Sequence, residues 1–314
     1  MLRYVLQRIL AAIPVMIFVA LFVFLLLRLT PGDPAAIIAG DTATPEQLEQ
    51  IRESLGLNEP LYIQFVTWIG SLLQGDFGTS ILSGTPVIDM IGQRMEPTLS
   101  LALTTMVLSI LIAVPLGIIA AWKHGTIVDQ LVMAISVLGF SVPVFVIGYV
   151  LISIFAMDLK WFPVQGFRPI GDGIGAFFSR IALPTITLTL LYIALIARIT
   201  RTSMLEILGE DYIRTARAKG LQERKVLMRH ALRNCSVPII TVIGIGFALI
   251  ISGVVVTESV FNLPGLGRLT VDAVLARDYP VIQAVILIFS LVYVLINLMI
   301  DIAYVLLDPR IRYQ

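Results

Sequence analysis

Six long runs of apolar residues dominate this sequence of 314 residues. A helix needs about 20 apolar residues to cross the roughly 30 Å hydrocarbon core of a bilayer, and these runs carry almost no charge. Composition agrees, because 58% of the residues are hydrophobic and 14% are charged, against about 45–50% and about 25% in a soluble domain. We expect membrane spans over residues 9–29, 99–122, 131–156, 181–197, 237–257 and 281–300.

The runs are predicted to be α-helices. Lipid offers no hydrogen-bond partner to an open strand edge, and the runs lack the alternating pattern of a membrane β-strand. The expected fold is therefore all-α, with about six transmembrane helices. The first run is longer than a secretory signal core and no clear cleavage pattern follows it, so we interpret it as an uncleaved helix. Five prolines in or beside the runs are expected to bend their helices: Pro14, Pro115, Pro143, Pro184 and Pro238.

The distribution of basic residues predicts the orientation in the membrane. Residues 198–233 contain nine of the 22 lysines and arginines, and cytoplasmic loops are enriched in these residue types. Counting spans from this basic loop places both termini in the cytoplasm. Three segments are then expected outside, at residues 30–98, 157–180 and 258–280.

The first outer segment is expected to form a helical insertion at about residues 31–97. Thr44, followed by Pro45 and Gln47, has the pattern of a capped helix start, and Gly56 is a helix stop. An apolar second helix is expected over residues 61–73, packed on the membrane domain.

Few residues in the sequence suit catalysis or metal binding. The two histidines, His124 and His230, lie in predicted cytoplasmic loops, and Cys235 is the single cysteine. The sequence contains no metalloprotease, serine hydrolase or phosphate-binding loop motif. We therefore expect no enzyme activity, and no catalytic, cofactor-binding or metal-binding residues.

The span interiors are almost free of charge, which bears on the class of transporter. Arg198, Glu258 and Asp301 lie at span ends, where we interpret them as solvated at the interface or ion-paired. A proton- or ion-coupled secondary carrier usually places ionisable groups inside its spans. A secondary carrier is therefore the weaker alternative to a permease that depends on other subunits, and a membrane scaffold is a third.

The basic loop at residues 207–238 is expected to form short helices at the membrane surface. Apolar residues recur in it at helical spacing beneath a basic face, and Gly220 allows a helix to end with positive φ. Thr215 and Ala216 are small enough for a partner to approach closely. The loop is therefore predicted to dock a cytosolic protein, with binding to anionic lipid as the alternative.

Residues 210–220 read Glu-Asp-Tyr-Ile-Arg-Thr-Ala-Arg-Ala-Lys-Gly and resemble the coupling loop of ABC importer permeases. The Thr-Ala-Arg-Ala-Lys-Gly ending is similar to that of the dipeptide, oligopeptide and nickel import family, and the likeness is closest to its dipeptide and glutathione permeases. Arg214 departs from the general ABC permease signature, which has glutamate there. Further matching motifs lie at residues 31–34, 55–57, 75–78, 230–234, 261–267, 277–280 and 308–310.

The resemblance implies a type I ABC importer permease fold and a single permease domain over residues 1–314, with a cytoplasmic coupling loop at about 200–236. It implies a bacterial inner membrane location and an ATP-driven import of peptides, glutathione or nickel by alternating access. The implied partners are a second homologous permease, two cytosolic ATPase subunits or domains that use ATP and Mg, an extracytoplasmic solute-binding protein and the lipid bilayer. Nucleic acid is not among them.

Two groups of residues are expected to carry this function. The ATPase-coupling loop comprises Tyr212, Ile213, Arg214, Thr215, Ala216, Arg217, Ala218, Lys219, Gly220 and Leu221. A second loop is expected to turn back toward the mouth of the solute pathway, because apolar residues in it alternate with turn-forming residues, and irregular backbone at membrane depth must be covered by protein. Its candidate residues are Glu258, Phe261, Pro264, Gly265 and Gly267.

Overall fold

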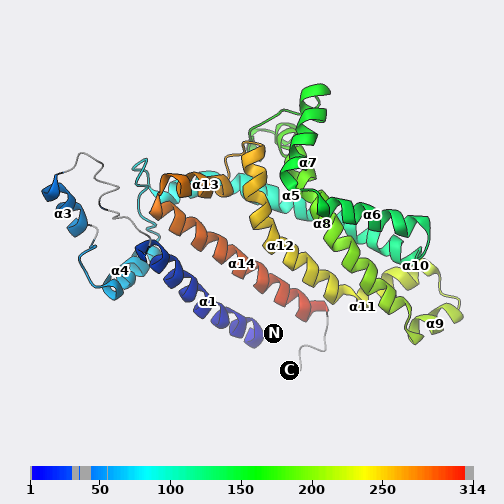
Figure 1. Cartoon of the computed structure of the whole chain (residues 1–314). Coiled ribbons are helices and arrows are strands. Elements are labelled where there is room, and N and C mark those ends of the chain that lie inside the picture. Colours follow the sequence, from blue (N-terminus) through cyan, green and yellow to red (C-terminus); the bar gives the residue numbers. More distant parts are fainter. Residues whose placement is uncertain (1, 30–34, 36–43, 55, 308–314) are drawn as a thin grey trace. The chain divides into compact units, whose positions relative to one another are not determined.

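The computed structural model describes residues 2–29, 35, 44–54 and 56–307. These residues are mainly helical and form no β-strand, only one isolated bridge between Thr79 and Pro86. Five helices are long and apolar enough to cross a membrane, and a bent helix pair makes up to six. The five are α1 (Leu2–Leu29), α5 (Val87–Trp122), α8 (Ile174–Leu208), α12 (Ser236–Val260) and α14 (Tyr279–Leu307) (Figure 1). The all-α prediction is confirmed.

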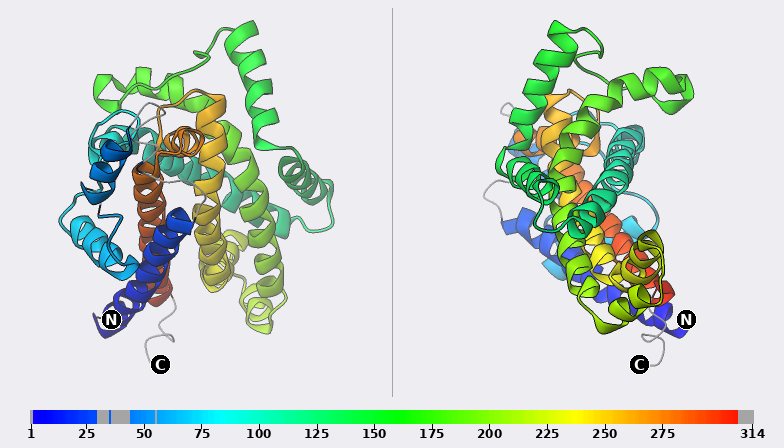
Figure 2. Two further views of the ribbon diagram at one scale, coloured as in Figure 1. Left: turned by 60° about the vertical axis from the view of Figure 1, so that its left-hand side comes forward. Right: turned by 90° about the vertical axis from the view of Figure 1, so that its right-hand side faces the viewer.

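The third predicted span is broken near its middle. Residues 131–156 were expected to form one helix, but α6 (Ile127–Ser141) and α7 (Val144–Leu151) meet at a bend of 100° (Figure 2). The π-helix η1 (Ile152–Asp158) continues α7. Pro143 lacks an N–H group and disfavours helical backbone in the residue before it, and Val142 is extended at φ −89° and ψ 127°. By contrast, three of the five prolines that were expected to bend their helices stay inside continuous helices: Pro14, Pro115 and Pro184.

The fourth predicted span, residues 181–197, belongs to a much longer helix. Helix α8 has 35 residues because it continues through less apolar sequence on both sides. It is also the most enclosed of the long helices, since 67% of its apolar window is buried, compared with 17% for α1 and 11% for α14. An enclosed helix of this kind forms the centre of a bundle, whereas α1 and α14 present apolar side chains outward.

The chain forms two compact units. Unit 1 contains Met1–Gln7, Glu96–Arg268 and Tyr293–Gln314, and unit 2 contains Arg8–Met95 and Leu269–Val292.

In unit 1, α8 packs against α12 and α6. Small residues allow the close helix contacts: a Cβ atom at Gly246 would lie 3.7 Å from Tyr192 of α8, and one at Gly244 would overlap Ile300 of α14. The main core contains side chains from α5, α7, α8 and α12, among them Leu101, Met106, Leu188, Tyr192, Ile250 and Val254.

In unit 2, the two helices predicted between the first and second spans are present. Helix α3 (Pro45–Ser54) begins with a reciprocal capping pair, because the Gln47 N–H donates to Thr44 Oγ1 at 3.3 Å and the Thr44 N–H donates to Gln47 Oε1 at 3.0 Å. Gly56, the predicted helix stop, follows α3 with a φ of 62°. Helix α4 (Leu61–Leu73) packs through Phe65 and Trp68 on Phe24 of α1.

Candidate functional site

The basic loop folds into short helices, and α9 (Asp211–Ala218) is the longest of them. Helix α8 ends at Leu208, and Glu210 takes up the extended backbone conformation that precedes a helix. Asp211 in the first turn and Arg217 in the last turn both complement the helix dipole. Because only Gly209 and Glu210 separate the two helices, α9 is a direct continuation of the most enclosed helix of unit 1.

Gly220 follows the C-cap residue of α9 and ends the helix in the way that the sequence predicts. Its φ is +76°. The Gly220 N–H donates to the Arg217 carbonyl at 2.9 Å, and the Leu221 N–H donates to the Ala216 carbonyl at 3.3 Å. These two bonds are the pair of a Schellman motif, which normally needs glycine at this position.

Two residues of the predicted coupling loop anchor α9 to its own chain. Ile213 is fully buried in a second core cluster that includes Met204 of α8 and Val226. Ala216 is 8% exposed, so its side chain faces the core of its own chain. Helical periodicity turns these two side chains inward because they lie three residues apart. The other predicted residues are exposed, namely Tyr212, Arg214, Thr215, Arg217, Ala218, Lys219, Gly220 and Leu221.

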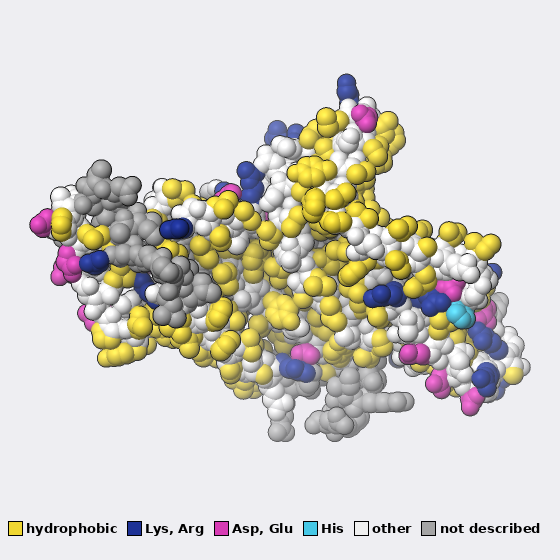
Figure 3. Space-filling view, viewed as in Figure 1, with side chains coloured by type: hydrophobic (Ala, Val, Ile, Leu, Met, Phe, Trp, Pro, Cys, Tyr) yellow, Lys and Arg dark blue, Asp and Glu magenta, His cyan; other side chains and the backbone are white. Residues whose placement is uncertain are grey.

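The exposed face of α9 is held in place by polar contacts. Arg217 donates to Glu223 at 2.7 Å, and this hydrogen bond raises the pKa of the Arg217 guanidinium. Arg214, which departs from the family signature, pairs with Asp211 at 3.1 Å on the same helix. The Asn234 amide donates to the Tyr212 hydroxyl at 2.8 Å. Charged side chains gather over α9, α10 (Glu223–Lys225) and the neighbouring end of α6, in contrast to the apolar cover of α7 (Figure 3).

A buried ion pair that the sequence analysis missed ties α6 to α8. Asp129 is 4% exposed, and Arg201 donates to both of its carboxylate oxygens, one of them at 2.7 Å. The Gly125 N–H donates to the same carboxylate at 3.0 Å, and His124 Nδ1 lies 3.1 Å from it. A bidentate guanidinium–carboxylate contact fixes geometry as well as charge. It therefore holds α8 to the first turn of α6, about two helical turns before α8 ends at Leu208.

We expect the substitution Asp129→Asn to destabilise the folded chain by about 1–3 kcal/mol, because it leaves a half-buried guanidinium without its charged partner. The free energy of unfolding in detergent would measure this. Asp172→Asn is the matched control, since the Arg168–Asp172 pair is about half exposed, at 60% and 50%, and spans 3.6 Å, so it contributes little. Equal effects of the two substitutions would show that the buried pair has no special role.

The second predicted loop closes around Glu258. This residue is fully buried, so of its two expected states, solvation at the membrane interface or an ion pair, the first is wrong. Thr98 Oγ1 donates to Glu258 Oε1 at 2.6 Å, and the Arg268 N–H donates to Oε2 at 2.9 Å. A Cβ atom at Gly265 would overlap the Glu258 carboxyl group, and one at Gly267 would lie 2.6 Å from the Val255 Cα atom.

The structure brings most of the predicted residues of this loop together. Glu258, Phe261, Gly265 and Gly267 are buried, and only Pro264 is exposed. The segment expected to be a loop also contains helix α13 (Leu266–Ala276). Thr98 was missed, because it lies 160 residues from Glu258. The turn is therefore a packed element of unit 1 built around a carboxyl group.

Comparison with known proteins identifies the family. Residues 113–313 match the family described as binding-protein-dependent transport system inner membrane component, and residues 1–102 match its N-terminal counterpart. The chain belongs to the binding-protein-dependent transport system inner membrane component family. This permease is therefore a component of an ABC transport system in the inner membrane. The secondary-carrier alternative is not favoured.

Similar proteins cover the whole permease. A probable peptide ABC transporter permease protein of Sinorhizobium fredii is 56% identical over 99% of each chain. The glutathione transport system permease protein GsiC of Escherichia coli K12 is 46% identical, and that of Salmonella paratyphi A is 45% identical, both over 100% of each chain.

A solved structure confirms the predicted ABC importer permease fold. The MetNI methionine ABC transporter in an inward-facing conformation aligns with a TM-score of 0.58, over 70% of this chain and 96% of that chain. The identity is 17%, so this likeness concerns the fold alone.

Proposed function

We propose that this permease moves di- or oligopeptides, or glutathione, across the inner membrane by alternating access. The support is its full-length likeness to permeases named for peptide and for glutathione transport, at 56% and 46% identity. Nickel import by the same kind of complex is the alternative within the family.

The proposed complex contains this chain, a second homologous permease, two cytosolic ATPase subunits or domains and an extracytoplasmic solute-binding protein. ATP and Mg act in the ATPases, and this chain is proposed to bind neither. Residues 212–221 are proposed to dock in a groove of an ATPase, because α9 combines an exposed face with an internal anchor. That anchor is the observation that carries the proposal.

The anchor explains how movement would be passed on. Ile213 is packed against Met204 of α8 and against Val226, so a force on α9 acts on the core of unit 1 and not on a free loop. Closure of the ATPase pair would move α9 and α8 together. The Asp129–Arg201 pair would carry the same movement to the α5–α6 turn.

Reconstituted transport tests the proposed function. The complete complex is placed in vesicles with ATP on the ATPase side, the binding protein is added on the other side, and uptake of labelled dialanine, trialanine and glutathione is measured. We expect ATP-dependent uptake of at least one probe. Uptake by the purified chain alone, driven by a proton or sodium gradient, would contradict the proposal and indicate a secondary carrier.

Both termini are proposed to lie in the cytoplasm, with α3 outside, and labelling of introduced cysteines tests this orientation. The variant Glu46→Cys, on exposed α3, should react with a membrane-impermeant maleimide in intact cells from which the outer membrane has been removed. Background is expected to be low, because burial raises the pKa of the Cys235 thiol to about 11 and leaves little thiolate. Reaction at Glu46→Cys only after cell lysis would reverse the topology.

A further inference from the structure

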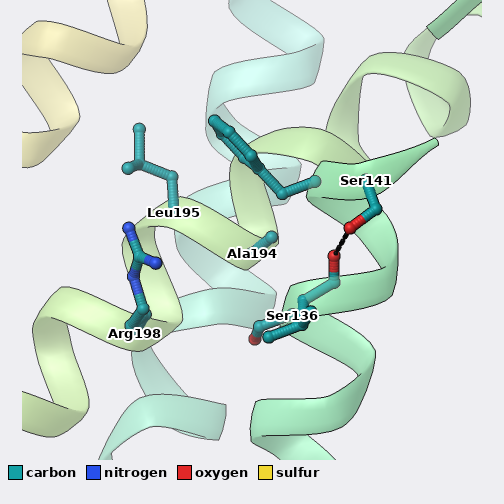
Figure 4. A pocket seen from close by; sticks show the side chains of 7 residues that line it. Ser136, Ser141, Ala194, Leu195 and Arg198 are labelled. Carbon is teal, nitrogen blue, oxygen red and sulfur yellow. Dashed lines mark hydrogen bonds between the residues drawn. The ribbon is translucent and has the colours of Figure 1, made fainter. Parts of the chain in front are cut away.

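A small cavity lies between α6 and α8 beside the bend at Pro143. Its volume is about 130 Å³. Helix α6 contributes Ser136, Val137, Phe140 and Ser141, and α8 contributes Ala194, Leu195 and Arg198 (Figure 4). The side chains of Arg198 and Ser141 come from opposite sides of the cavity, and Ala194 lies between them (Figure 4).

Both serine hydroxyl groups of the cavity already donate their hydrogen to a backbone carbonyl of α6. Ser136 donates to the Val132 carbonyl and Ser141 donates to the Val137 carbonyl, both at 2.8 Å. A hydroxyl has one donor hydrogen and two acceptor lone pairs. Each serine therefore offers a ligand only acceptor capacity, which suits an N–H or ammonium group.

The other side of the cavity offers only donors. Within the described part of the chain, no side-chain hydrogen bond or ion pair given by the structure involves the guanidinium of Arg198, whereas Arg201, three residues on, is paired with Asp129. A guanidinium has five N–H donors and no acceptor, and its planar fork matches a carboxylate or phosphate. The Arg198 side chain is exposed, so its guanidinium is open to a ligand.

We infer that this cavity, formed by Arg198, Ser136 and Ser141, is a binding subsite for a zwitterion, with its anionic group at Arg198 and its N–H donors at the serines. The apolar walls of Val137, Phe140 and Leu195 hold the carbon skeleton between the two ends. The volume is smaller than the about 300–1,000 Å³ of a pocket that encloses a drug-sized ligand. The subsite therefore holds one end of a longer molecule.

A zwitterionic ligand of this kind can be either a transported solute or a lipid headgroup. A peptide or glutathione in transit carries a carboxylate and N–H groups, and this reading rests on the proposed function. The headgroup of phosphatidylethanolamine carries a phosphate and an ammonium group. A solute in transit must also leave, so a single small subsite of modest affinity suits a transport path.

The test compares the complete complex with its Arg198→Gln, Arg198→Lys and Ser141→Ala variants in vesicles. The probes are dialanine, trialanine and glutathione, each with free and with amidated carboxylates. For a solute site, Arg198→Gln should raise the apparent KM for the free acid about tenfold or more, the loss expected for one charged hydrogen-bonded contact. It should leave the KM of the amide unchanged, Arg198→Lys should restore part of the difference, and Ser141→Ala should raise the KM of both forms.

A second arm uses vesicles with and without phosphatidylethanolamine. If the lipid is the ligand, removing it should lower ATP hydrolysis by the native complex but not by the Arg198→Gln complex, and free and amidated probes should respond alike. Arg168→Gln is the matched control, because it removes one exposed arginine charge outside the cavity.

The outcomes separate this inference from the proposed function. If the native complex takes up none of the probes, the proposed function fails, and the lipid arm still decides whether Arg198 binds a zwitterion. If Arg198→Gln behaves as Arg168→Gln does in both arms, the subsite is overturned.

Discussion

Replacing Gly220 by valine is expected to abolish solute uptake while leaving the permease folded and inserted in the membrane. Gly220 has φ +76°, and a β-branched residue held at positive φ is strained by about 1–3 kcal/mol. Among the described residues, and apart from its two neighbours in sequence, no atom lies within 4 Å of a Cβ atom placed there, so within this part of the chain the effect is confined to the end of α9. Coupling between distant sites is typically about 1–3 kcal/mol, which a strain of this size can remove.

Two measurements in vesicles check this result, uptake and ATP hydrolysis. In the Gly220→Val complex the ATPase should dissociate or hydrolyse ATP without stimulation by the loaded binding protein. Gly220→Asn is the matched control, because asparagine has a similar size but tolerates the left-handed region, and it should retain more uptake. Normal uptake and normal stimulation of ATP hydrolysis in the Gly220→Val complex would show that α9 is not the coupling element.

Replacing Gly265 by alanine is expected to destabilise unit 1 by roughly 2–5 kcal/mol. The added methyl group would overlap the Glu258 carboxyl group, so Glu258 must give up its hydrogen bonds to Thr98 and to the Arg268 N–H. Each bond lost by a buried polar group costs about 1–3 kcal/mol, and overpacking costs about as much.

Chemical unfolding in detergent measures this effect against a glycine that has space around it. Gly92 lies in α5, and outside the neighbouring turns of that helix no atom of the described residues lies within 4 Å of a Cβ atom placed there, so Gly92→Ala should be neutral or stabilising. Thr98→Ala should reproduce part of the loss at Gly265. A Gly265→Ala protein as stable as Gly92→Ala would show that the turn relaxes freely and that Glu258 does not organise it.

Much of the local structure could be predicted from the sequence. The capping pair of Thr44 and Gln47 was predicted because both partners lie within one helical turn. The positive φ of Gly220 was predicted because a helix C-terminus has few alternatives to glycine. The membrane helices followed from hydropathy summed along the chain, which needs no knowledge of neighbours. Pro143 was expected to bend its helix, but the 100° angle was not foreseen.

The long-range part of the candidate site could not be predicted in this way. Asp129 and Arg201 are 72 residues apart, and Thr98 lies 160 residues from Glu258. In the sequence, Arg198 and Arg201 cannot be told apart, because both are basic residues that follow a predicted span. Only the position of α6 shows that one is ion-paired and the other lines a cavity.

For this permease, the sequence by itself determined the all-α membrane fold, the capped start of α3 at Thr44 and the end of α9 at Gly220, since these depend on hydropathy and on hydrogen bonds within a turn. The tertiary structure decided which face of each helix is enclosed. It turned Ala216 inward, buried Glu258 and left Arg198 without a side-chain partner among the described residues. The physical reason is that the rotation and packing of helices depend on close contacts between segments that are distant in the sequence. Local sequence patterns do not show which distant segments lie in contact.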